Sequence, residues 1–317
     1  MSFKVQKTQK ALKPHKKFKI QDLSVYINLL TDFGFKRIFG IKEVMLSFLN
    51  TVLDIAGGIV DLTYGNVEIL GLTKDDRKAI FDLICITGNG ERIIVEIQNI
   101  EEKYYRDRML FYASLLIQEQ NVQVKVDDKN WNYKLAPVFS INILNFLLGK
   151  KIHPNRYLTY WLIKERDTNE PLYDTDKLTF VCVELPLFDK TLQGVKTALE
   201  QWIFLIKNLH ELDSIPEKYK TELFEKIFEM AKIAKMDKKE VSLYLKSLNE
   251  MNRIQYEINR RDTALQAVTA ELNNAWTTVA TVSAERDNAW LERDNAWNIV
   301  AQKDKEIEEL KRRFGLN

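Results

Sequence analysis

Two apolar runs joined by a short turn constrain this chain more than any other feature of its sequence. The runs cover residues 79–86 and 92–98, and the turn signal Gly88-Asn89-Gly90 lies between them. Such composition predicts two antiparallel strands of a meander, preceded by a further strand over residues 67–72. Each of the two runs contains an acidic residue that a buried strand does not need. We therefore expect this hairpin to carry chemistry as well as structure.

The length of the turn decides which side chains face one another across the hairpin. If the loop holds three residues centred on Asn89, Asp82 stands directly opposite Glu96. Because side chains alternate between the two faces of a strand, Gln98 then shares a face with Glu96. A two-residue Asn89-Gly90 turn would shift the register by one residue and place Asp82 and Glu96 on opposite faces. The three-residue loop is thus the geometry that brings the three side chains together.

Two carboxylates placed opposite one another destabilise a sheet unless a cation neutralises them. Mg²⁺ suits such a site because it prefers hard oxygen ligands and keeps part of its hydration shell, and Mn²⁺ can substitute for it. A bound metal can activate water and stabilise the charge that develops on a phosphodiester. The alternative is that Asp82 and Glu96 are solvated positions on a half-exposed sheet, and from spacing alone that plainer interpretation is the more frequent one.

The rest of the first 254 residues alternates between helical and strand-like patterns. Helical spacing is expected over 44–52, with an end near Gly57-Gly58, and over 101–120. Strand-like runs are found at 138–144, 157–163 and 178–185, and residues 194–254 become helical. This order predicts an α/β fold in which a mixed central sheet is flanked by helices, with a small helical bundle packed on it.

The C-terminal segment, residues 255–314, repeats with the seven-residue period of a coiled coil. The hexapeptide Glu-Arg-Asp-Asn-Ala-Trp occurs at 285–290 and again at 292–297. With Leu265 at heptad position a, twelve of the fifteen a and d positions are apolar, and Arg286 and Arg293 interrupt the stripe. The pattern predicts a homo-oligomer, dimer or higher, formed through residues 255–314. A tail folded back on its own core and a lone solvated helix are the alternatives.

The charge distribution argues weakly against a broad basic surface for nucleic acid. Residues 1–19 hold seven lysines and no acidic residue, which leaves 40 of the 47 basic residues against all 45 acidic ones. Phosphate binding must therefore come from local clusters or from the lysine-rich arm.

Cysteine usage and hydropathy favour a cytoplasmic protein without a membrane partner. Cys85 and Cys182 lie in apolar runs, as buried thiols of a reducing compartment do. Three scattered histidines give no zinc-ligand spacing. No run reaches the ~18 apolar residues of a membrane span, and the basic start lacks the apolar core of a signal peptide.

Several segments, taken in their joint order, resemble one known family. The segments are residues 31–40 (TDFGFKRIFG), Phe81-Asp82, residues 95–98 (VEIQ), Arg108 with Tyr112, residues 137–144 (PVFSINIL) and residues 183–185 (VEL). Together they resemble the recombination-promoting nuclease and transposase family, whose members have the PD-(D/E)XK nuclease fold. The resemblance extends over residues 31–188. Pro186-Leu187 departs from it, because the family often has a lysine there, and this puts any role for that position in doubt.

The resemblance implies a metal-dependent DNA endonuclease whose catalytic residues are Asp82, Glu96 and Gln98. Asp82 and Glu96 would bind Mg²⁺, with the carbonyl group of Ile97 as a further ligand. Gln98 stands where the broader superfamily has a lysine. Because glutamine carries no charge, it can only orient water through hydrogen bonds, and slower or more conditional cleavage is expected.

Five side chains near these positions are candidate phosphate contacts, and they are Lys36, Arg77, Arg106, Arg108 and Tyr112. Arg108 and Tyr112 are four residues apart and share one helix face, so they can reach a phosphate together. An exposed arginine packed on an aromatic ring is the alternative. Asp32 is expected to cap a helix or turn before Gly34 rather than to act in the site.

Four regions are expected along the chain. They are a basic flexible arm at 1–20, a PD-(D/E)XK core at 21–190, a helical subdomain at 191–254 and a long helix or coiled coil at 255–317. The leading hypothesis is a Mg²⁺-dependent DNA endonuclease related to transposases, in which the coiled coil pairs two cores so that both strands are cut. The alternative is a catalytically weak or inactive nuclease fold that binds nucleic acid or a protein partner. A purely structural scaffold is the least favoured.

Overall fold

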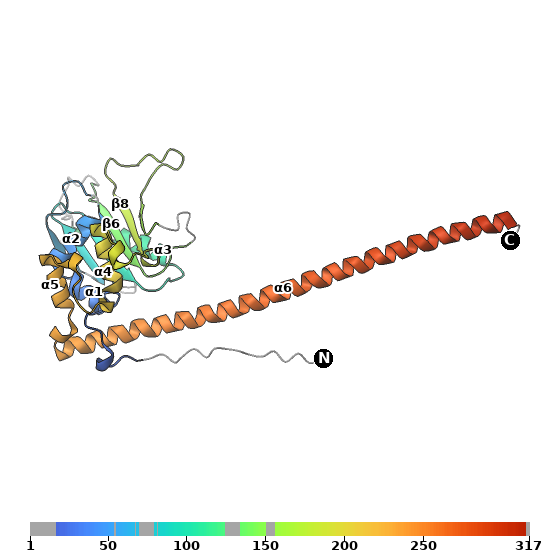
Figure 1. Ribbon diagram of the computed structural model, residues 1–317. Helices are drawn as coiled ribbons and strands as arrows, with labels where there is room; N and C mark the ends of the chain where they lie inside the picture. Colours follow the sequence, from blue (N-terminus) through green and yellow to red (C-terminus); the bar gives the residue numbers. More distant parts are fainter. Residues whose placement is uncertain are drawn as a thin grey trace. The chain divides into compact units, whose positions relative to one another are not determined.

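A mixed sheet forms the centre of the compact part of the molecule (Figure 1). The computed structural model describes residues 17–53, 55–66, 68–69, 79–80, 82–123, 134–149 and 156–314. Within these ranges the sheet has six strands, in the order β1 (Leu62–Tyr64), β4 (Leu83–Thr87), β5 (Arg92–Gln98), β6 (Val138–Leu144), β8 (Leu178–Glu184) and β7 (Leu158–Trp161). Strands β1, β4 and β5 are antiparallel, β5, β6 and β8 are parallel, and β7 is antiparallel to β8.

Helices lie on both faces of this sheet. They are α1 (Asp32–Phe39), α2 (Lys42–Val52), α3 (Tyr105–Gln123), α4 (Ala198–Asn208), α5 (Glu222–Ala231) and the first turns of α6 (Lys238–Phe314). A separate antiparallel pair joins β2 (Glu68–Ile69) to β3 (Ala79–Ile80). The predicted mixed sheet with flanking helices is confirmed.

The hairpin of β4 and β5 has the register that a three-residue loop requires. Leu83 pairs with Val95, so the next position toward the open end brings Asp82 opposite Glu96. Gly90 has a φ of 89° in the turn, a backbone conformation that glycine adopts without steric cost. The predicted pairing of these two strands is therefore confirmed.

The single strand predicted over residues 79–86 is wrong, because the chain forms β3 and β4 with an interruption at Asp82. The N–H group of Ile97 donates to Oδ2 of Asp82 at 2.8 Å. A side-chain oxygen thus accepts a hydrogen bond that a backbone carbonyl would accept in a regular ladder. Asp82 therefore lies between β3 and β4, and its side-chain carboxylate takes the place of a backbone carbonyl just before β4 begins.

Other boundaries differ from the predictions by a few residues. Strands β5 and β6 have the predicted bounds, whereas β7 and β8 are shorter. Helix α2 ends at Val52 rather than near Gly57-Gly58, because the backbone turns extended at Leu53. Strand β1 was not predicted, since three residues are too few to show alternation. Of the strand predicted over 67–72, residues 68–69 form β2 and the others lie outside the described residues.

The two faces of β5 pack against different helices, as the alternation of its side chains requires. Val95 belongs to the large hydrophobic core that also contains the buried residues of α1, α2, α4 and α5. Ile94 packs instead with Ala113 and Leu116 of α3. Figure 1 shows α3 on the side of the sheet opposite these other helices. Glu96 and Gln98 share the α3 face with Ile94, and that face holds the candidate site.

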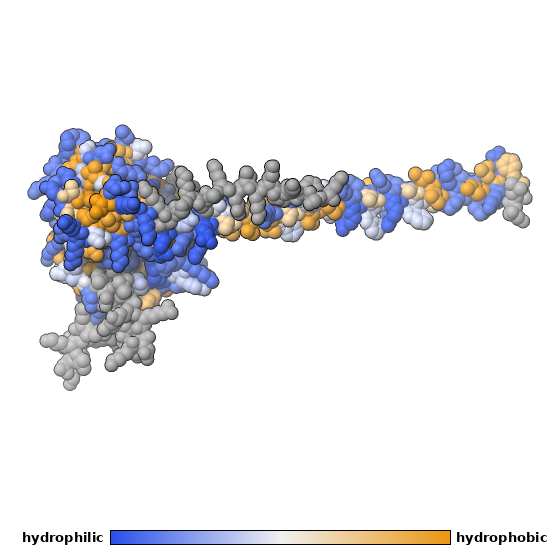
Figure 2. All heavy atoms as spheres, turned by 90° about the horizontal axis from the view of Figure 1, so that it is seen from below, coloured by the Kyte–Doolittle hydropathy of each residue, from blue (hydrophilic) through white to orange (hydrophobic). Residues whose placement is uncertain are grey.

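Helix α6 begins inside the compact unit and continues beyond it. Within the described chain, residues 17–255 form the compact unit and residues 256–314 belong to a second one. Tyr244 and Leu248 are buried in the large core, and the hydroxyl of Tyr244 accepts a hydrogen bond from the N–H of Asn28 at 2.9 Å. Apolar side chains recur along the helical tail, where they are exposed (Figure 2).

Both cysteines lie in the interior of the protein. Cys85 and Cys182 are fully buried, as predicted. Among the described helices, none is both long enough and apolar enough to cross a bilayer.

Trp202→Ala is expected to lower the free energy of unfolding by about 3–5 kcal/mol, because it empties a buried aromatic contact between helices. The ring of Trp202 is 1% exposed and lies 5.8 Å from that of Phe39, 5.7 Å from that of Phe48 and 5.1 Å from that of Phe224. Denaturant titration followed by circular dichroism measures the change. The matched control is Trp161→Ala, since that side chain is 53% exposed and its loss should change stability by only about 0.5 kcal/mol. Equal effects of the two variants would contradict the assignment of Trp202 to the core.

Candidate active site

Two carboxylates from neighbouring strands meet on the α3 face of the sheet. The N–H group of Asp82 donates to Oε1 of Glu96 at 3.0 Å, and the N–H group of Ile97 donates to Oδ2 of Asp82 at 2.8 Å. Each carboxylate is thereby held by the backbone of the other's strand. The side chains of Asp82 and Glu96 converge, as the hairpin register requires.

Burial and mutual repulsion make this pair hard to ionise. Glu96 is 7% exposed, and its pKa is raised to about 8, first by burial and then by the charge of Asp82. Burial also raises the pKa of Asp82, although the hydrogen bond from Ile97 and the charges of Lys36 and Arg108 oppose the shift. The pair is therefore destabilised when both groups are charged, unless a cation compensates.

Gln98 is held two residues beyond Glu96 by a network of polar groups. Its amide oxygen accepts a hydrogen bond from Nη2 of Arg108 at 2.9 Å. Its amide nitrogen donates to the carbonyl oxygen of Ile100 at 3.1 Å and to Oε1 of Glu102 at 3.3 Å. These contacts fix the orientation of the amide group, so its oxygen points toward the arginine of α3.

Arg108 brings a positive charge from α3 to this face of the sheet. Its Nη1 lies 2.8 Å from both carboxylate oxygens of Glu102. Its guanidinium carbon lies 4.9 Å from the ring centre of Tyr105 and 5.7 Å from that of Tyr112. Arg108 packs on Tyr112, as one of the two sequence interpretations expects, and it also acts electrostatically on Glu96. The contact of this pair with a phosphate stays a prediction.

Lys36 supplies a second positive charge from α1. It acts electrostatically on Asp82 and Glu96, and its Nζ forms an ion pair with Asp32 at 2.6 Å. The expectation that Asp32 caps this helix is wrong, because the hydroxyl of Thr31 accepts the hydrogen bond from the N–H of Gly34 at 3.0 Å. Asp32 occupies the first helical position instead, where its carboxylate is free to pair with Lys36.

A buried polar row beside Glu96 was missed at the level of sequence. Asn142 of β6 is the register partner of Glu96 and is 1% exposed. Its side-chain oxygen accepts a hydrogen bond from the hydroxyl of Tyr105 at 2.9 Å, and its amide nitrogen donates to Oγ of Ser140 at 3.0 Å. Tyr105 in turn senses the charge of Glu96, which raises the pKa of its hydroxyl after burial. The signal was the polar alternation Ser-Ile-Asn inside an apolar strand.

The structure places Arg106, one of the predicted phosphate contacts, away from this group of residues. Arg106 donates from Nη2 to the carbonyl oxygen of Leu148 at 3.1 Å and lines a different pocket, with Trp161 and Phe180. Arg77 lies outside the described residues.

Comparison with known proteins identifies the family of this chain. The model of the PD-(D/E)XK nuclease family transposases matches residues 29–260, which is well over half of the sequence. The chain belongs to this family. No curated protein and no solved structure gives a match.

The residues of this site fit a divalent cation. The buried Glu96 and the half-buried Asp82 form a pair of hard oxygen donors, which is the donor set that Mg²⁺ prefers. The N–H and carbonyl of a strand residue point toward the same neighbouring strand, so the carbonyl of Ile97 also faces the Asp82 side of β5. Among the described residues, no group of three or more His, Cys, Asp or Glu side chains gathers as a metal site. Backbone and water would have to complete the ligand set.

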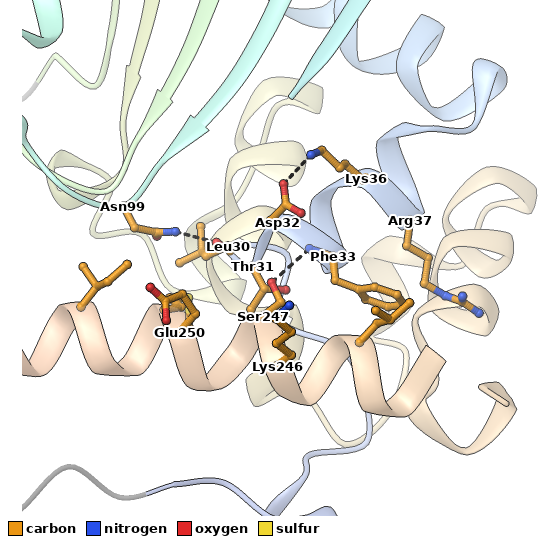
Figure 3. Close-up of a pocket in the computed structure, with 13 residues that line it drawn as sticks. Leu30, Thr31, Asp32, Phe33, Lys36, Arg37, Asn99, Lys246, Ser247 and Glu250 are labelled. Atoms are coloured by element: carbon orange, nitrogen blue, oxygen red, sulfur yellow. Dashed lines mark hydrogen bonds and ion pairs between the residues drawn. The ribbon is translucent and has the colours of Figure 1, made fainter. Parts of the chain in front are cut away.

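An open pocket of about 770 Å³ lies beside α1, and the described residues that line it do not include Asp82, Glu96 or Gln98 (Figure 3). The first turn of α1, Asn99 and the first turns of α6 line it. Asp32 and Lys36 belong both to this pocket and to the electrostatic surroundings of Asp82. Lys246 and Glu250 of α6 form the far wall. The walls of the pocket carry both charged and apolar groups.

Glu96→Gln is expected to stabilise the metal-free protein more at pH 8 than at pH 5. The folded chain holds the proton of Glu96 up to about pH 8, whereas the unfolded chain releases it near the ordinary value of 4.5. The stability associated with this group is fully present below pH 4.5 and is lost as the pH rises toward 8. Glutamine cannot ionise and escapes this loss. Thermal unfolding in EDTA across this pH range measures the difference.

The matched control is Glu101→Gln, because Glu101 is exposed and lies close by in the sequence. Its melting temperature should follow that of the unchanged protein at every pH. A difference between Glu96→Gln and the unchanged protein that stays constant from pH 5 to pH 8 would contradict the raised pKa.

Proposed function

We propose that this protein is a divalent-metal-dependent endonuclease that hydrolyses phosphodiester bonds in DNA. The observation that carries the proposal is the buried Asp82–Glu96 pair, in which each carboxylate accepts a hydrogen bond from the backbone beside the other. A like-charged pair so enclosed is unfavourable by itself and becomes favourable when a cation binds. Membership of a nuclease and transposase family supports DNA as the substrate class.

Asp82 and Glu96 are the proposed metal ligands, joined by the carbonyl oxygen of Ile97, with Mg²⁺ as the cation and Mn²⁺ as its substitute. When bound, the metal supplies activation of water and compensation of the charge that develops on the phosphate. The two side chains hold their oxygens in place before any metal arrives, because backbone N–H groups fix one oxygen of each. Such preorganisation reduces the rearrangement that binding requires.

Gln98 is proposed to orient the attacking water. Its amide oxygen accepts one hydrogen bond from Arg108, and a carbonyl-type oxygen has a second lone pair with which it can accept another from water. Glutamine cannot provide the positive charge of a lysine at this position. Arg108 and Lys36 provide positive charge from α3 and α1 instead, and we assign them, with Tyr112, to the phosphate of the substrate.

The helical tail is proposed to pair two chains, so that two cores act on one DNA duplex. One core contains one carboxylate pair and would cut one strand at a time. The apolar a and d positions of residues 255–314 are the basis of this proposal.

Asp82→Asn and Glu96→Gln are each expected to lower plasmid nicking in Mg²⁺ or Mn²⁺ by at least about a hundredfold. Each change removes a negative metal ligand but keeps the size and hydrogen-bonding capacity of the side chain. Conversion of supercoiled plasmid to nicked and linear forms measures the rate. Asp107→Asn is the matched control, because Asp107 is an exposed carboxylate on α3.

Undiminished cleavage by the folded Asp82 and Glu96 variants would contradict the assignment of these residues. A chain that binds DNA but cleaves it in neither metal would support the alternative of a binding module built on a nuclease fold. The network that engages Gln98 with Arg108 and Glu102 is the feature that favours this alternative, since it occupies the amide group.

Lys36→Ala is expected to weaken DNA binding and to reduce the slope of log affinity against log salt by about 1, as loss of one phosphate contact does. Fluorescence anisotropy with a labelled duplex in EDTA measures affinity without cleavage. Lys42→Ala is the matched control, because Lys42 is exposed on the next helix and pairs with Asp61. If both variants change the salt slope equally, Lys36 has no specific part in phosphate binding.

A further inference from the structure

The part of α6 beyond the compact unit presents a stripe of apolar side chains to solvent. Each residue of the stripe is at least half exposed, and they include Leu265, Val268, Leu272, Val279, Val282, Val300, Ile307 and Leu310. They recur at the a and d positions of the heptad over a helix that is continuous to Phe314. An exposed apolar stripe of this length marks an interaction surface, although Arg286, Arg293 and Lys303 interrupt it.

One hexapeptide pattern occurs three times along this helix. Residues 271–276 read Glu-Leu-Asn-Asn-Ala-Trp, and residues 285–290 and 292–297 read Glu-Arg-Asp-Asn-Ala-Trp. In every copy glutamate is at position g, alanine is at d and tryptophan is at e. Position a is leucine in the first copy and arginine in the other two. The repeated alanine therefore lies at the interface formed by the a and d positions, which we call the seam. The repeated glutamate and tryptophan lie at the g and e positions that flank it.

We infer that the partner of this surface is a second copy of the chain, and that the two tails form a parallel, in-register, two-stranded coiled coil fixed by Arg–Glu pairs between chains. The inference deepens the pairing of two cores in the proposed function and rests on it. It specifies the direction, the register and the residues that enforce them.

Charge complementarity sets the direction and the register. In a coiled coil each a side chain inserts into a hole formed by four residues of the facing helix. In a parallel, in-register pair, the hole for Arg286 contains Glu285 of the second copy, and the hole for Arg293 contains Glu292. Each arginine at the seam therefore meets a carboxylate, and two-fold symmetry gives four such pairs. A shift by one heptad would bring Arg286 of one chain next to Thr278 and Arg293 of the other next to Ile299, and two of the four pairs would be lost.

An antiparallel pair lacks this complementarity. Antiparallel packing places g positions beside g positions, and the g residues of the three copies are Glu271, Glu285 and Glu292. Carboxylates would then line the same edge and repel one another. The arginines would lie on the other edge, away from them.

The small and large residues of the pattern also fit a parallel pair. Parallel packing places each g residue beside the e residue five positions later in the other chain, so Glu285 lies beside Trp290 and Glu292 lies beside Trp297. The indole N–H is a hydrogen-bond donor and the carboxylate is an acceptor. Alanine at d leaves room for the indole to cover the seam. In the single chain Trp290 and Trp297 are 53% and 67% exposed, so this surface is open to a partner.

A two-stranded coiled coil accommodates an arginine at heptad position a better than a three-stranded coiled coil does. In a two-stranded coil the long side chain can extend past the seam to the g residue and to water, whereas a third helix encloses it further. An enclosed charge is unfavourable unless it is fully paired. In the single chain Arg286 pairs with Asp287 and Arg293 with Asp294, and Arg293 also lies 3.8 Å over the ring of Trp290. These contacts are exposed, and exposed ion pairs are weak enough to exchange for partners at an interface.

A charge-exchange experiment on the full chain tests the inference without DNA or metal. One variant carries Arg286→Glu and Arg293→Glu, and the other carries Glu285→Arg and Glu292→Arg. The unchanged chain, of 37.2 kDa, should have twice that mass by light scattering at micromolar concentration. Each variant alone should dissociate at least about tenfold more readily, because its g and a positions carry like charges. An equimolar mixture should recover dimers that contain one chain of each kind.

The matched control carries Asp287→Arg and Asp294→Arg. It makes the same change of net charge as the second variant, but at position b on the outer face, and it should remain dimeric. A monomeric or three-chain unchanged protein would overturn the inference. So would variants that dimerise as well alone as they do in the mixture.

Direction is tested by a cysteine at d. Ala289→Cys places two thiols at the same level of a parallel, in-register pair and should give an interchain disulfide on mild oxidation. Asn288→Cys, on the outer face, should not. The native thiols do not interfere, because Cys85 and Cys182 are buried. A dimer in which Ala289→Cys fails to cross-link would overturn the parallel arrangement. Failure of cleavage alone would leave these results unchanged, so the two proposals can be separated.

Discussion

The enclosure of two carboxyl groups, which repel one another when both are ionised, between β4 and β5 is the constraint on which the proposed chemistry depends. Asp82 and Glu96 could relieve their repulsion by turning apart, but each is tied by a hydrogen bond to the backbone beside the other. Burial removes the water that would otherwise screen them, which is why the pKa of Glu96 rises to about 8. The fold thus stores an electrostatic cost that a divalent cation would remove. The same arrangement interrupts the strand before β4, so a local loss of regular pairing accompanies the site.

The hairpin was predictable because its information is local. Alternation of polar and apolar residues and a glycine-rich turn determine which side chains share a face, and β5 and β6 follow the predicted bounds. The surroundings of the site were harder to foresee. Lys36 reaches the carboxylates from a helix far away in the sequence, and Asn142 lies beside Glu96 only because a parallel strand pairs in one register. Such contacts depend on how distant elements pack, which periodicity does not encode.

Replacing a lysine by glutamine changes how the site obtains positive charge. A lysine on β5 would bring its charge along the same strand as Glu96, whereas Gln98 must share its amide oxygen with the guanidinium of Arg108. That guanidinium is also paired with Glu102, so its charge is partly compensated before substrate arrives. A phosphate that displaced Glu102 would form a bidentate hydrogen bond with the planar guanidinium group of Arg108. In the proposed function, substrate binding would thus be coupled to the release of Gln98 and Arg108 from their resting partners, and cleavage would be conditional rather than rapid.

The helical tail carries arginine at two a positions, where a coiled coil would be more stable with leucine. Arginine at two seam positions weakens a coiled coil compared with leucine, which the first copy of the hexapeptide has at Leu272. A sequence selected for strength alone would have kept leucine in all three copies. The two arginines follow glutamates at the adjoining edge, so the strength lost at the seam is exchanged for a defined direction and register. In the proposed function each chain has one carboxylate pair, so a defined arrangement of two chains would allow both strands of a duplex to be reached. Tight but unregistered association would not provide it.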